Sequence, residues 1–215
     1  ERRLPADAFV VGFVGRIHPK KGIDWLLESF ASFSRRNDNA LLVIVGDTDG
    51  SLHFDARERY RHLADRLGVA SRVIFCGFQE DVRPYLADFD VLVFPSRLPE
   101  SFGRVLIEAM ALEVPVITSA HGGAVEVVDD GDEGLWVEVD DVTGLTAALQ
   151  SMADSPSRRR QMGRRGRERV ARPYSRPRVS GTIVDIRRQV AEAGAQTSDP
   201  TGADRGASPV AGNRG

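Results

Sequence analysis

The stretch DVLVFPSRLPESFGRVLIEAMALEVPVITS, residues 90–119, contains two apolar runs on either side of a polar loop and a helical pattern. The runs 91–94 and 114–119 are short and rich in Val, which predicts buried strands. A strand, a helix and a second strand in this order predict a right-handed crossover between parallel strands. The rest of the chain shows whether this unit is repeated.

Similar apolar, β-branched runs recur along the chain and alternate with helical patterns. The predicted strands are AFVVGFVG (8–15), ALLVIVG (40–46), RVIFCG (72–77), DVLVFPS (90–96), VPVITS (114–119) and GLWVEV (134–139). Three- and four-residue spacing predicts helices over 23–33 and over 55–67, the second ended by Gly68. The runs are apolar nearly throughout, as expected of strands covered on both faces. The predicted fold is α/β, a doubly wound and mainly parallel sheet.

The composition limits the classes of partner. The formal net charge of -2 gives no overall basic surface for nucleic acid. No apolar run approaches the length of a membrane span. Cys76 is the single cysteine, so the chain holds neither an internal disulfide nor a cysteine-based zinc site, and we interpret this residue as a small apolar core side chain. These features suit a reducing cytoplasm.

The length of 215 residues predicts one folded domain, 1–192, followed by a tail. Two helices are expected after residue 138, and a last one from about residue 175. Residues 193–215 lack aromatic side chains and consist mainly of Gly, Ala, Ser, Pro, Thr and Asp, which predicts disorder. The chain enters its first strand after a short polar lead, which indicates a piece of a longer protein.

The loop before the helix predicted from Gly103 has the character of an anion site. The first backbone N–H groups of a helix lack partners and attract phosphate. Glu100 precedes this helix start, and Glu108 lies on its second turn, so two carboxylates bracket the anionic centre. The helix dipole contributes about 0.3 to 1 kcal/mol, which is too little without cations.

The loop after the first strand, GRIHPKKG (15–22), supplies cations in Arg16, Lys20 and Lys21. A charge pair at about 4 Å and an effective dielectric near 20 contributes roughly 4 kcal/mol. Loops at the carboxyl ends of parallel strands meet at the same edge of the sheet. Arg16 and one of the lysines are therefore expected to dominate phosphate affinity. The alternative is a basic loop that is simply solvated.

Five segments, in register, resemble one family. They are GRIHPKKG (15–22), GFQEDVRPYLADFDVLVFPS (77–96), PESFGRVLIEAMA (99–111), GGAVEVVDDGDEGLWV (122–137) and RRRQMGRRGRERV (158–170). The chain resembles, from about Val10 to Tyr174, the donor-binding C-terminal half of GT-B glycosyltransferases. The resemblance is to the large retaining group of group 1 or family 4 type, which includes sucrose synthases and phosphatidylinositol mannosyltransferases.

This resemblance implies a reaction that moves a sugar from a nucleotide-diphosphate sugar to an acceptor, with retention of anomeric configuration and without a metal or other cofactor. It implies that Arg16 and Lys21 hold the diphosphate and stabilise it as it leaves. Glu100 would contact the hydroxyls of the donor sugar, and Glu108 those of the ribose. Arg16, Lys21 and Glu100 are thus the candidate catalytic residues.

The resemblance also implies a set of backbone contacts to the donor. The amides of Phe102, Gly103 and Arg104 would face sugar and phosphate, and that of Val105 would complete the set. Phe78 belongs to the loop that lines the base. The full set of candidate donor-binding residues is Gly15, Phe78, Glu100, Ser101, Phe102, Gly103, Arg104, Val105 and Glu108. The acceptor-binding domain, N-terminal in the family, is expected to be the partner of this domain and to be absent from this chain.

The chain departs from the family pattern at two places. Val125 stands where relatives commonly have proline, which favours a looser turn after Gly122 and Gly123. Arg176 stands where they often have tryptophan. We expect the first departure to leave the site intact, since both glycines and Glu126 remain.

Several other signals are open to simpler interpretations. The triplet DTD (47–49) mimics a metal-binding motif, but it lies in a glycine-flanked turn, and we expect no metal there. His18 and His121 are interpreted as polar loop residues, with the alternative that they border the site. The arginines of 158–172 indicate a solvated face, with docking to anionic lipid at the inner face of a cell membrane, or to the acceptor-binding domain, as alternatives.

Three rival functions remain open on the sequence alone. The first is a binding module that keeps a nucleotide-sugar pocket without transfer activity. The second is a sugar phosphorylase or nucleotide-sugar epimerase on the same fold, which the arrangement of Glu100 and Glu108 disfavours. The third is a structural interaction domain, for which substitutions at Arg16 or Glu108 would leave nucleotide affinity unchanged.

Overall fold

A computed structural model of the chain describes residues 4–48, 50, 55–100 and 102–171. They belong to the first of two compact units, Glu1–Tyr174; the second, Ser175–Gly215, lies outside the described residues, as do the helix predicted from residue 175 and the tail predicted over 193–215.

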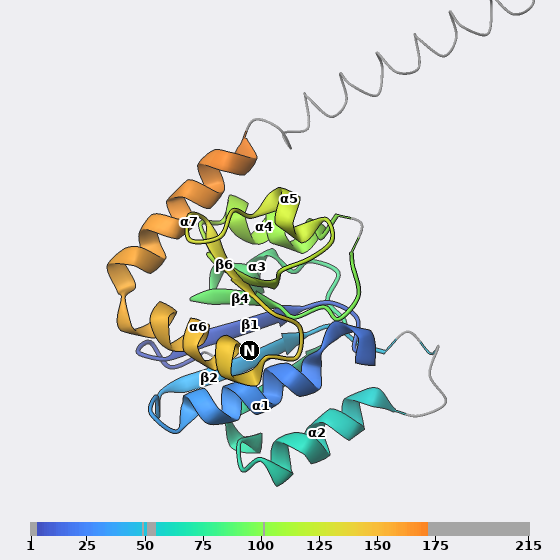
Figure 1. The fold of residues 1–215 in the computed structure, drawn as a ribbon. Helices are drawn as coiled ribbons and strands as arrows, with labels where there is room; N and C mark the ends of the chain where they lie inside the picture. Colours follow the sequence, from blue (N-terminus) through green and yellow to red (C-terminus); the bar gives the residue numbers. More distant parts are fainter. Residues whose placement is uncertain (1–3, 49, 51–54, 101, 172–215) are drawn as a thin grey trace, which may run out of the picture. The chain divides into compact units, whose positions relative to one another are not determined.

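The described residues form one six-stranded parallel sheet (Figure 1). The strands are β1 (Phe9–Val14), β2 (Ala40–Val45), β3 (Val73–Gly77), β4 (Val91–Phe94), β5 (Val116–Ser119) and β6 (Gly134–Val137). All six fall within the predicted apolar runs. The doubly wound α/β fold predicted from the sequence is confirmed.

Helices follow the strands in alternation. They are the 3-10 turns η1 (Pro19–Lys21) and η2 (Ala70–Arg72) and the helices α1 (Ile23–Ser34), α2 (Ala56–Arg66), α3 (Arg83–Ala87), α4 (Arg104–Ala111), α5 (Ala124–Val127), α6 (Val142–Asp154) and α7 (Pro156–Ala171). The predicted helix over 55–67 matches α2, which Asp55 caps by accepting hydrogen bonds from the amides of Arg57 and Glu58. Gly68 follows it in the left-handed conformation, with φ 72°.

The sheet separates two hydrophobic clusters, one on each face. Side chains of α1, α2 and α6, among them Leu26, Tyr60 and Leu149, pack with Phe13 of β1 on one face. Those of α3, α4 and α5 pack with Val10 on the other. Figure 1 shows these helices on the opposite side of the sheet from α1 and α2. Successive residues of a strand point to opposite faces, so burial on both faces explains why the strands are apolar at nearly every position.

The strand order is β3-β2-β1-β4-β5-β6. The order reverses between β1 and β4, whose pairing is parallel with Val11 opposite Val91. Ligands of open α/β sheets bind at the carboxyl ends of the strands, at such a reversal. A ligand site is therefore expected at the loops after β1 and β4. These loops carry Arg16, Lys21 and Glu100.

The arginine run of α7, for which the sequence indicates a solvated face, is in part paired with acidic residues of the same domain. The pairs are Arg159–Asp90, Arg165–Asp132, Arg167–Glu113 and Arg169 with Asp129 and Glu133. The helix also packs closely on the end of α4, because a Cβ at Gly163 would lie 1.9 Å from the carbonyl oxygen of Glu113. Several arginines of this run thus hold α7 to the domain.

The structure also bears on two sequence predictions, the burial of Cys76 and the lack of a membrane span. Cys76 is only partly buried on β3, and burial raises the pKa of its thiol. Among the described helices, none has both the length and the apolar character needed to cross a membrane.

Candidate functional site

Lys21 and Glu100 form an ion pair across the reversal of strand order. The ammonium nitrogen Nζ of Lys21 lies 2.5 Å from Oε1 of Glu100. Lys21 ends the turn η1 after β1, and Glu100 belongs to the loop after β4, 79 residues further along. Two of the candidate catalytic residues are thus in direct contact.

The Glu100 carboxylate has a second hydrogen-bond donor. The hydroxyl Oγ of Ser96 lies 2.9 Å from the same oxygen, Oε1. Partial burial works to raise the pKa of Glu100, but the hydrogen bonds from Lys21 and Ser96 and the charges of Lys21 and Arg16 outweigh it, so that this pKa is lowered overall. The carboxylate is therefore held in its ionised, hydrogen-bond-accepting form.

Arg16 is part of the same electrostatic environment. Its side chain is exposed, and its charge contributes to the lowered pKa of Glu100. Arg16 follows Gly15, whose amide donates to the carbonyl of Val45 at 2.9 Å and continues the pairing of β1 with β2. The structure thus brings Lys21 into contact with Glu100, and the charge of Arg16 acts on the same carboxylate.

The basic loop is tightly built. His18 caps η1, because its Nδ1 accepts a hydrogen bond from the amide of Lys20 at 3.1 Å. Gly22 follows with φ 67°, and a Cβ there would lie 2.1 Å from the carbonyl oxygen of Pro95. Lys20 is exposed, whereas the side chain of Lys21 is only 15% exposed. Of the two lysines, Lys21 is the one directed to Glu100.

The helix α4 begins where the sequence predicted. Gly103 is its N-cap residue, with φ 61°, and has no side chain to satisfy the first N–H groups. Arg104 and Val105 are the first two helical residues, and Phe102 just before them is 45% exposed. The candidate backbone donors are therefore at a helix N-terminus that follows Glu100 by three residues.

The remaining candidates are Glu108, Phe78 and Ser101. Glu108 is exposed on the second turn of α4. Phe78 follows β3 and is 75% exposed, with β2 lying between β3 and β1 in the sheet. Ser101 lies outside the described residues.

The glycine pair 122–123 packs against the backbone of Glu100. The amide of Gly123 donates to the Glu100 carbonyl at 2.8 Å, and a Cβ at Gly122 would lie 2.9 Å from the Glu100 amide nitrogen. The amide of Val125 donates to the carbonyl of Gly122 at 3.3 Å, a bond that the family's proline lacks the N–H to make. This bond closes the turn at which the sequence departs from the pattern.

Three further residues lie at the site: Ser96 and Arg97, which the sequence did not single out, and His121, for which a place at the border of the site was the alternative to a polar loop residue. Ser96 donates to Glu100, and the ring nitrogen Nε2 of His121 lies 2.8 Å from the Ser96 carbonyl oxygen. Arg97 contacts the basic loop through its side chain and its backbone. The signal that points to Ser96 and Arg97 is their position directly after β4, at the carboxyl end of a strand next to the reversal.

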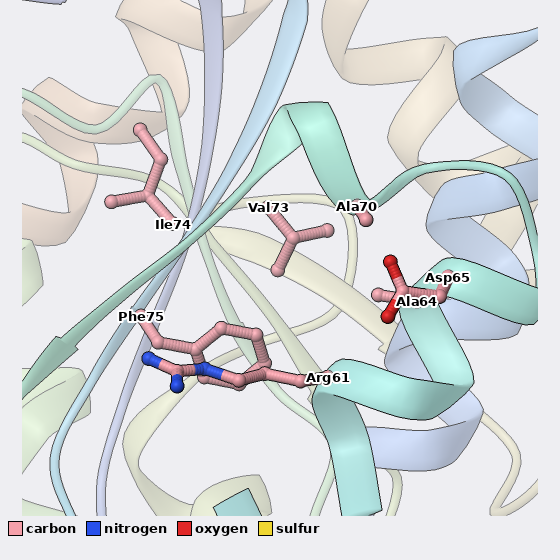
Figure 2. Close-up of a pocket in the computed structure, with 7 residues that line it drawn as sticks. All are labelled: Arg61, Ala64, Asp65, Ala70, Val73, Ile74 and Phe75. Carbon is pink, nitrogen blue, oxygen red and sulfur yellow. The ribbon is translucent and has the colours of Figure 1, made fainter. Parts of the chain in front are cut away.

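Two other features of the structure include none of the predicted site residues. A pocket between α2 and the edge strand β3 is lined by Arg61, Asp65 and Phe75, among others, and by none of the predicted site residues (Figure 2). Asp47 of the triplet DTD accepts a hydrogen bond from the Thr48 amide and pairs with Arg57 at 3.3 Å, so its carboxylate serves the turn; Asp49 lies outside the described residues.

Comparison with known proteins places this geometry in a family. The family described as Glycosyl transferases group 1 matches residues 1–169. A curated relative, lipopolysaccharide core biosynthesis glycosyltransferase LpsE of Rhizobium meliloti (strain 1021), is 33% identical over 182 residues, which are 85% of this chain and 50% of the relative.

Solved structures of similar proteins have the same fold as this chain. Sucrose-phosphate synthase from Thermosynechococcus elongatus superposes with a TM-score of 0.81 at 34% identity, over 88% of this chain and 47% of that one. Anabaena Alr3699/HepE in complex with UDP and glucose superposes with a TM-score of 0.76 at 27% identity, over 88% and 49%. The chain spans about half the length of the curated relatives it matches. On the match over most of its length, the chain belongs to the Glycosyl transferases group 1 family.

Proposed function

We propose that this chain is the donor-binding half of a glycosyltransferase that transfers a sugar from a nucleotide-diphosphate sugar to an acceptor. The observation that carries the proposal is the Lys21–Glu100 pair, which stands directly before the N-terminus of α4 at the reversal of strand order. In this proposal, residues 1–192 form the donor domain, and the acceptor is held by a partner domain that corresponds to the rest of the relatives' length.

The diphosphate is placed where cations and backbone donors meet. The first amides of α4 offer hydrogen bonds to phosphate oxygens, and Arg16 and Lys21 offer positive charge. Because the side chain of Lys21 is largely shielded from water, its attraction to an anion is stronger than that of an exposed lysine. In its catalytic role, this group stabilises the negative charge that develops on the leaving diphosphate.

The two glutamates take the two ends of the donor. Oε1 of Glu100 already accepts from Lys21 and Ser96, so we assign Oε2 to the hydroxyls of the donor sugar. Glu108, on the second turn of α4, is assigned to the ribose hydroxyls. Phe78 belongs to the loop that we assign to the base. We assign sugar and phosphate to the backbone of the segment that follows Glu100, namely Ser101, Phe102, Gly103, Arg104 and Val105.

We further propose that the transfer retains the anomeric configuration and needs no metal. Retention requires that the acceptor approach on the face from which the diphosphate leaves. Metal independence rests on Arg16, Lys21 and the α4 amides as the compensating charges. The UDP and glucose bound to Alr3699/HepE support a uridine nucleotide sugar as the first donor to test.

Calorimetry on the 215-residue chain tests the proposal, with UDP-glucose, GDP-mannose and ADP-glucose as ligands and EDTA present throughout. We expect one of these donors to bind, and Arg16→Ala, Lys21→Ala and Glu108→Ala to weaken it. Lys20→Ala is the matched control, because Lys20 is adjacent and equally charged but exposed. Absence of binding by all three donors, or equal affinity across the whole set of variants, would refute the assignment.

A further inference from the structure

The side chain of Arg97 joins three loops at the carboxyl edge of the sheet. Its NH1 group donates to Oδ1 of Asp24 at 2.7 Å and to the carbonyl oxygen of Pro19 at 3.1 Å. Its Nε donates to Oδ1 of Asp140 at 2.6 Å. These partners come from the turn η1, the first turn of α1 and the segment between β6 and α6.

The backbone around Arg97 is tied to the same turn. The amide of Arg97 donates to the carbonyl oxygen of Lys20 at 2.8 Å. Next to it, the carbonyl of Pro95 lies so close to Gly22 that no side chain fits there. The residues before and after Lys21 are therefore fixed to the loop after β4, and the Lys21 side chain leaves this junction toward Glu100.

Asp140 is itself held in an uncommon backbone conformation. Its φ is 61°, in the left-handed region that residues other than glycine adopt rarely, with Asp and Asn as the commonest exceptions. The next residue, Asp141, caps α6 by accepting from the Gly144 amide at 2.8 Å. The ion pair with Arg97 thus anchors the start of α6 to the loop after β4.

We propose that Arg97 is a positioning residue for the donor site: it holds the turn η1 against the loop after β4 so that Lys21 meets both Glu100 and the donor's diphosphate. The proposal rests on the proposed function for the diphosphate, whereas the contact of Lys21 with Glu100 belongs to the ligand-free protein. Arginine suits this role because its planar fork reaches several acceptors in fixed directions, which a single ammonium group does not.

The test compares Arg97→Gln and Arg97→Lys with the matched control Arg72→Gln. Arg72 also donates from NH1 to a backbone carbonyl, that of Ser34 at 2.9 Å, and pairs with a carboxylate, Asp38. Its side chain is 32% exposed and that of Arg97 28%, but Arg72 contacts residues 34–38, at the end of α1 and just after it, instead of η1. The control therefore loses a structural arginine of similar burial away from the site.

The first readout is calorimetric affinity for UDP, GDP and ADP. Coupled neighbouring residues commonly interact strongly enough to change an equilibrium several-fold, so we expect Arg97→Gln to weaken the tightest of these nucleotides about tenfold. Arg97→Lys is expected to weaken it similarly, and Arg72→Gln to leave it unchanged. In a Lys21→Ala background, Arg97→Gln should have no further effect. Full affinity in Arg97→Lys would instead indicate that only the charge matters and would overturn the proposal.

The second readout needs no nucleotide. A ¹³C NMR titration of the Glu100 carboxyl should show its pKa rising in Arg97→Gln, because Lys21 is no longer held against it, and unchanged in Arg72→Gln. An unchanged Glu100 titration in Arg97→Gln overturns the positioning role even if no nucleotide binds. If the wild type binds none of the nucleotides, the proposed function is refuted, and the Glu100 titration still decides whether Arg97 positions Lys21.

Asp140→Asn provides a milder variant in case Arg97→Gln does not fold. It keeps the shape of the side chain and removes only the charge that Nε of Arg97 contacts. We expect it to raise the pKa of Glu100 and to weaken the same nucleotide, both by less than Arg97→Gln. A folded Asp140→Asn that changes neither property counts against the proposal.

Discussion

Lys21 and Glu100 are 79 residues apart in the sequence, and the ammonium group of one lies against the carboxylate of the other. The pair joins the loops after β1 and β4, the two strands between which the order of the sheet reverses. Without ligand, the ammonium group of Lys21 donates a hydrogen bond to the Glu100 carboxylate and balances its charge. We infer that a bound diphosphate shares Lys21 with this carboxylate and leaves Glu100 oriented toward the sugar.

The ionisation of Glu100 should depend on Lys21. The folded-state pKa of Glu100 lies below its ordinary value of 4.5, so its contribution to stability is fully present above pH 4.5 and is lost as the pH falls through the folded-state pKa. In Lys21→Met this pKa should rise, and stability should fall less on acidification. A ¹³C NMR titration and urea unfolding between pH 3 and pH 6 measure the two effects. Lys20→Met is the control, and an equal shift there would argue against a specific pair.

Gly22 should be essential for the junction of the two loops. Its φ of 67° disfavours a side chain, and the 2.1 Å from a Cβ position to the Pro95 carbonyl oxygen leaves no room for one. Gly68 has a similar φ of 72° but nothing within 4 Å of its Cβ position. We expect Gly68→Ala to lower the free energy of unfolding by about 1 kcal/mol, the cost of the left-handed conformation. Gly22→Ala should lower it by several times as much, and equal losses in urea unfolding would contradict the described packing.

Arg169 should stabilise the domain more than its neighbours on α7. It pairs with Glu133, whose side chain is only 4% exposed, and with Asp129. Without Arg169 the buried carboxylate of Glu133 keeps, among the described residues, only the hydrogen bond from the Asp129 amide, so Arg169→Ala should lower the free energy of unfolding by roughly 2 kcal/mol. Arg164 is exposed on the same helix. Arg164→Ala should change stability by less than about 0.5 kcal/mol. If both variants unfold alike in urea, the pairing of α7 contributes little.

Glu108 should recognise the ribose hydroxyls and nothing else of the donor. The wild type should therefore bind the preferred nucleoside diphosphate more tightly than its 2′,3′-dideoxy analogue, by about tenfold for a hydrogen bond to a charged group. Glu108→Ala should abolish this ratio, and Glu100→Gln, the control on the sugar side, should preserve it. If the affinity ratio is unchanged in Glu108→Ala, residues other than Glu108 bind the ribose hydroxyls.

Much of the fold could be predicted from local patterns. The strands follow from apolar β-branched runs, and the ends of α2 from Asp55 and Gly68, because these signals act within a few residues. The N-terminus of α4 at Gly103 was predicted for the same reason. The placement of Arg16, Lys21 and Glu100 at one edge followed from the rule that parallel strands end together.

The finer arrangement of the site depends on contacts that no local pattern encodes. Lys20 and Lys21 are adjacent in η1, and contacts of this turn with the loop after β4, among them the packing of Gly22 against Pro95, direct Lys21 to Glu100. Arg97 meets Asp24 and Asp140, residues far away in sequence, through side-chain geometry. The sequence predicts a solvated face for the arginines of α7, because their acidic partners lie on other elements that no local pattern identifies.

The most direct test of the central claim is a crystal structure of the 215-residue chain with its preferred nucleoside diphosphate. The account predicts the phosphates within hydrogen-bond distance of the Arg104 and Val105 amides and of the ammonium group of Lys21. A nucleotide bound elsewhere, for example in the pocket between α2 and β3, or bound with its phosphates turned away from Lys21, would contradict it.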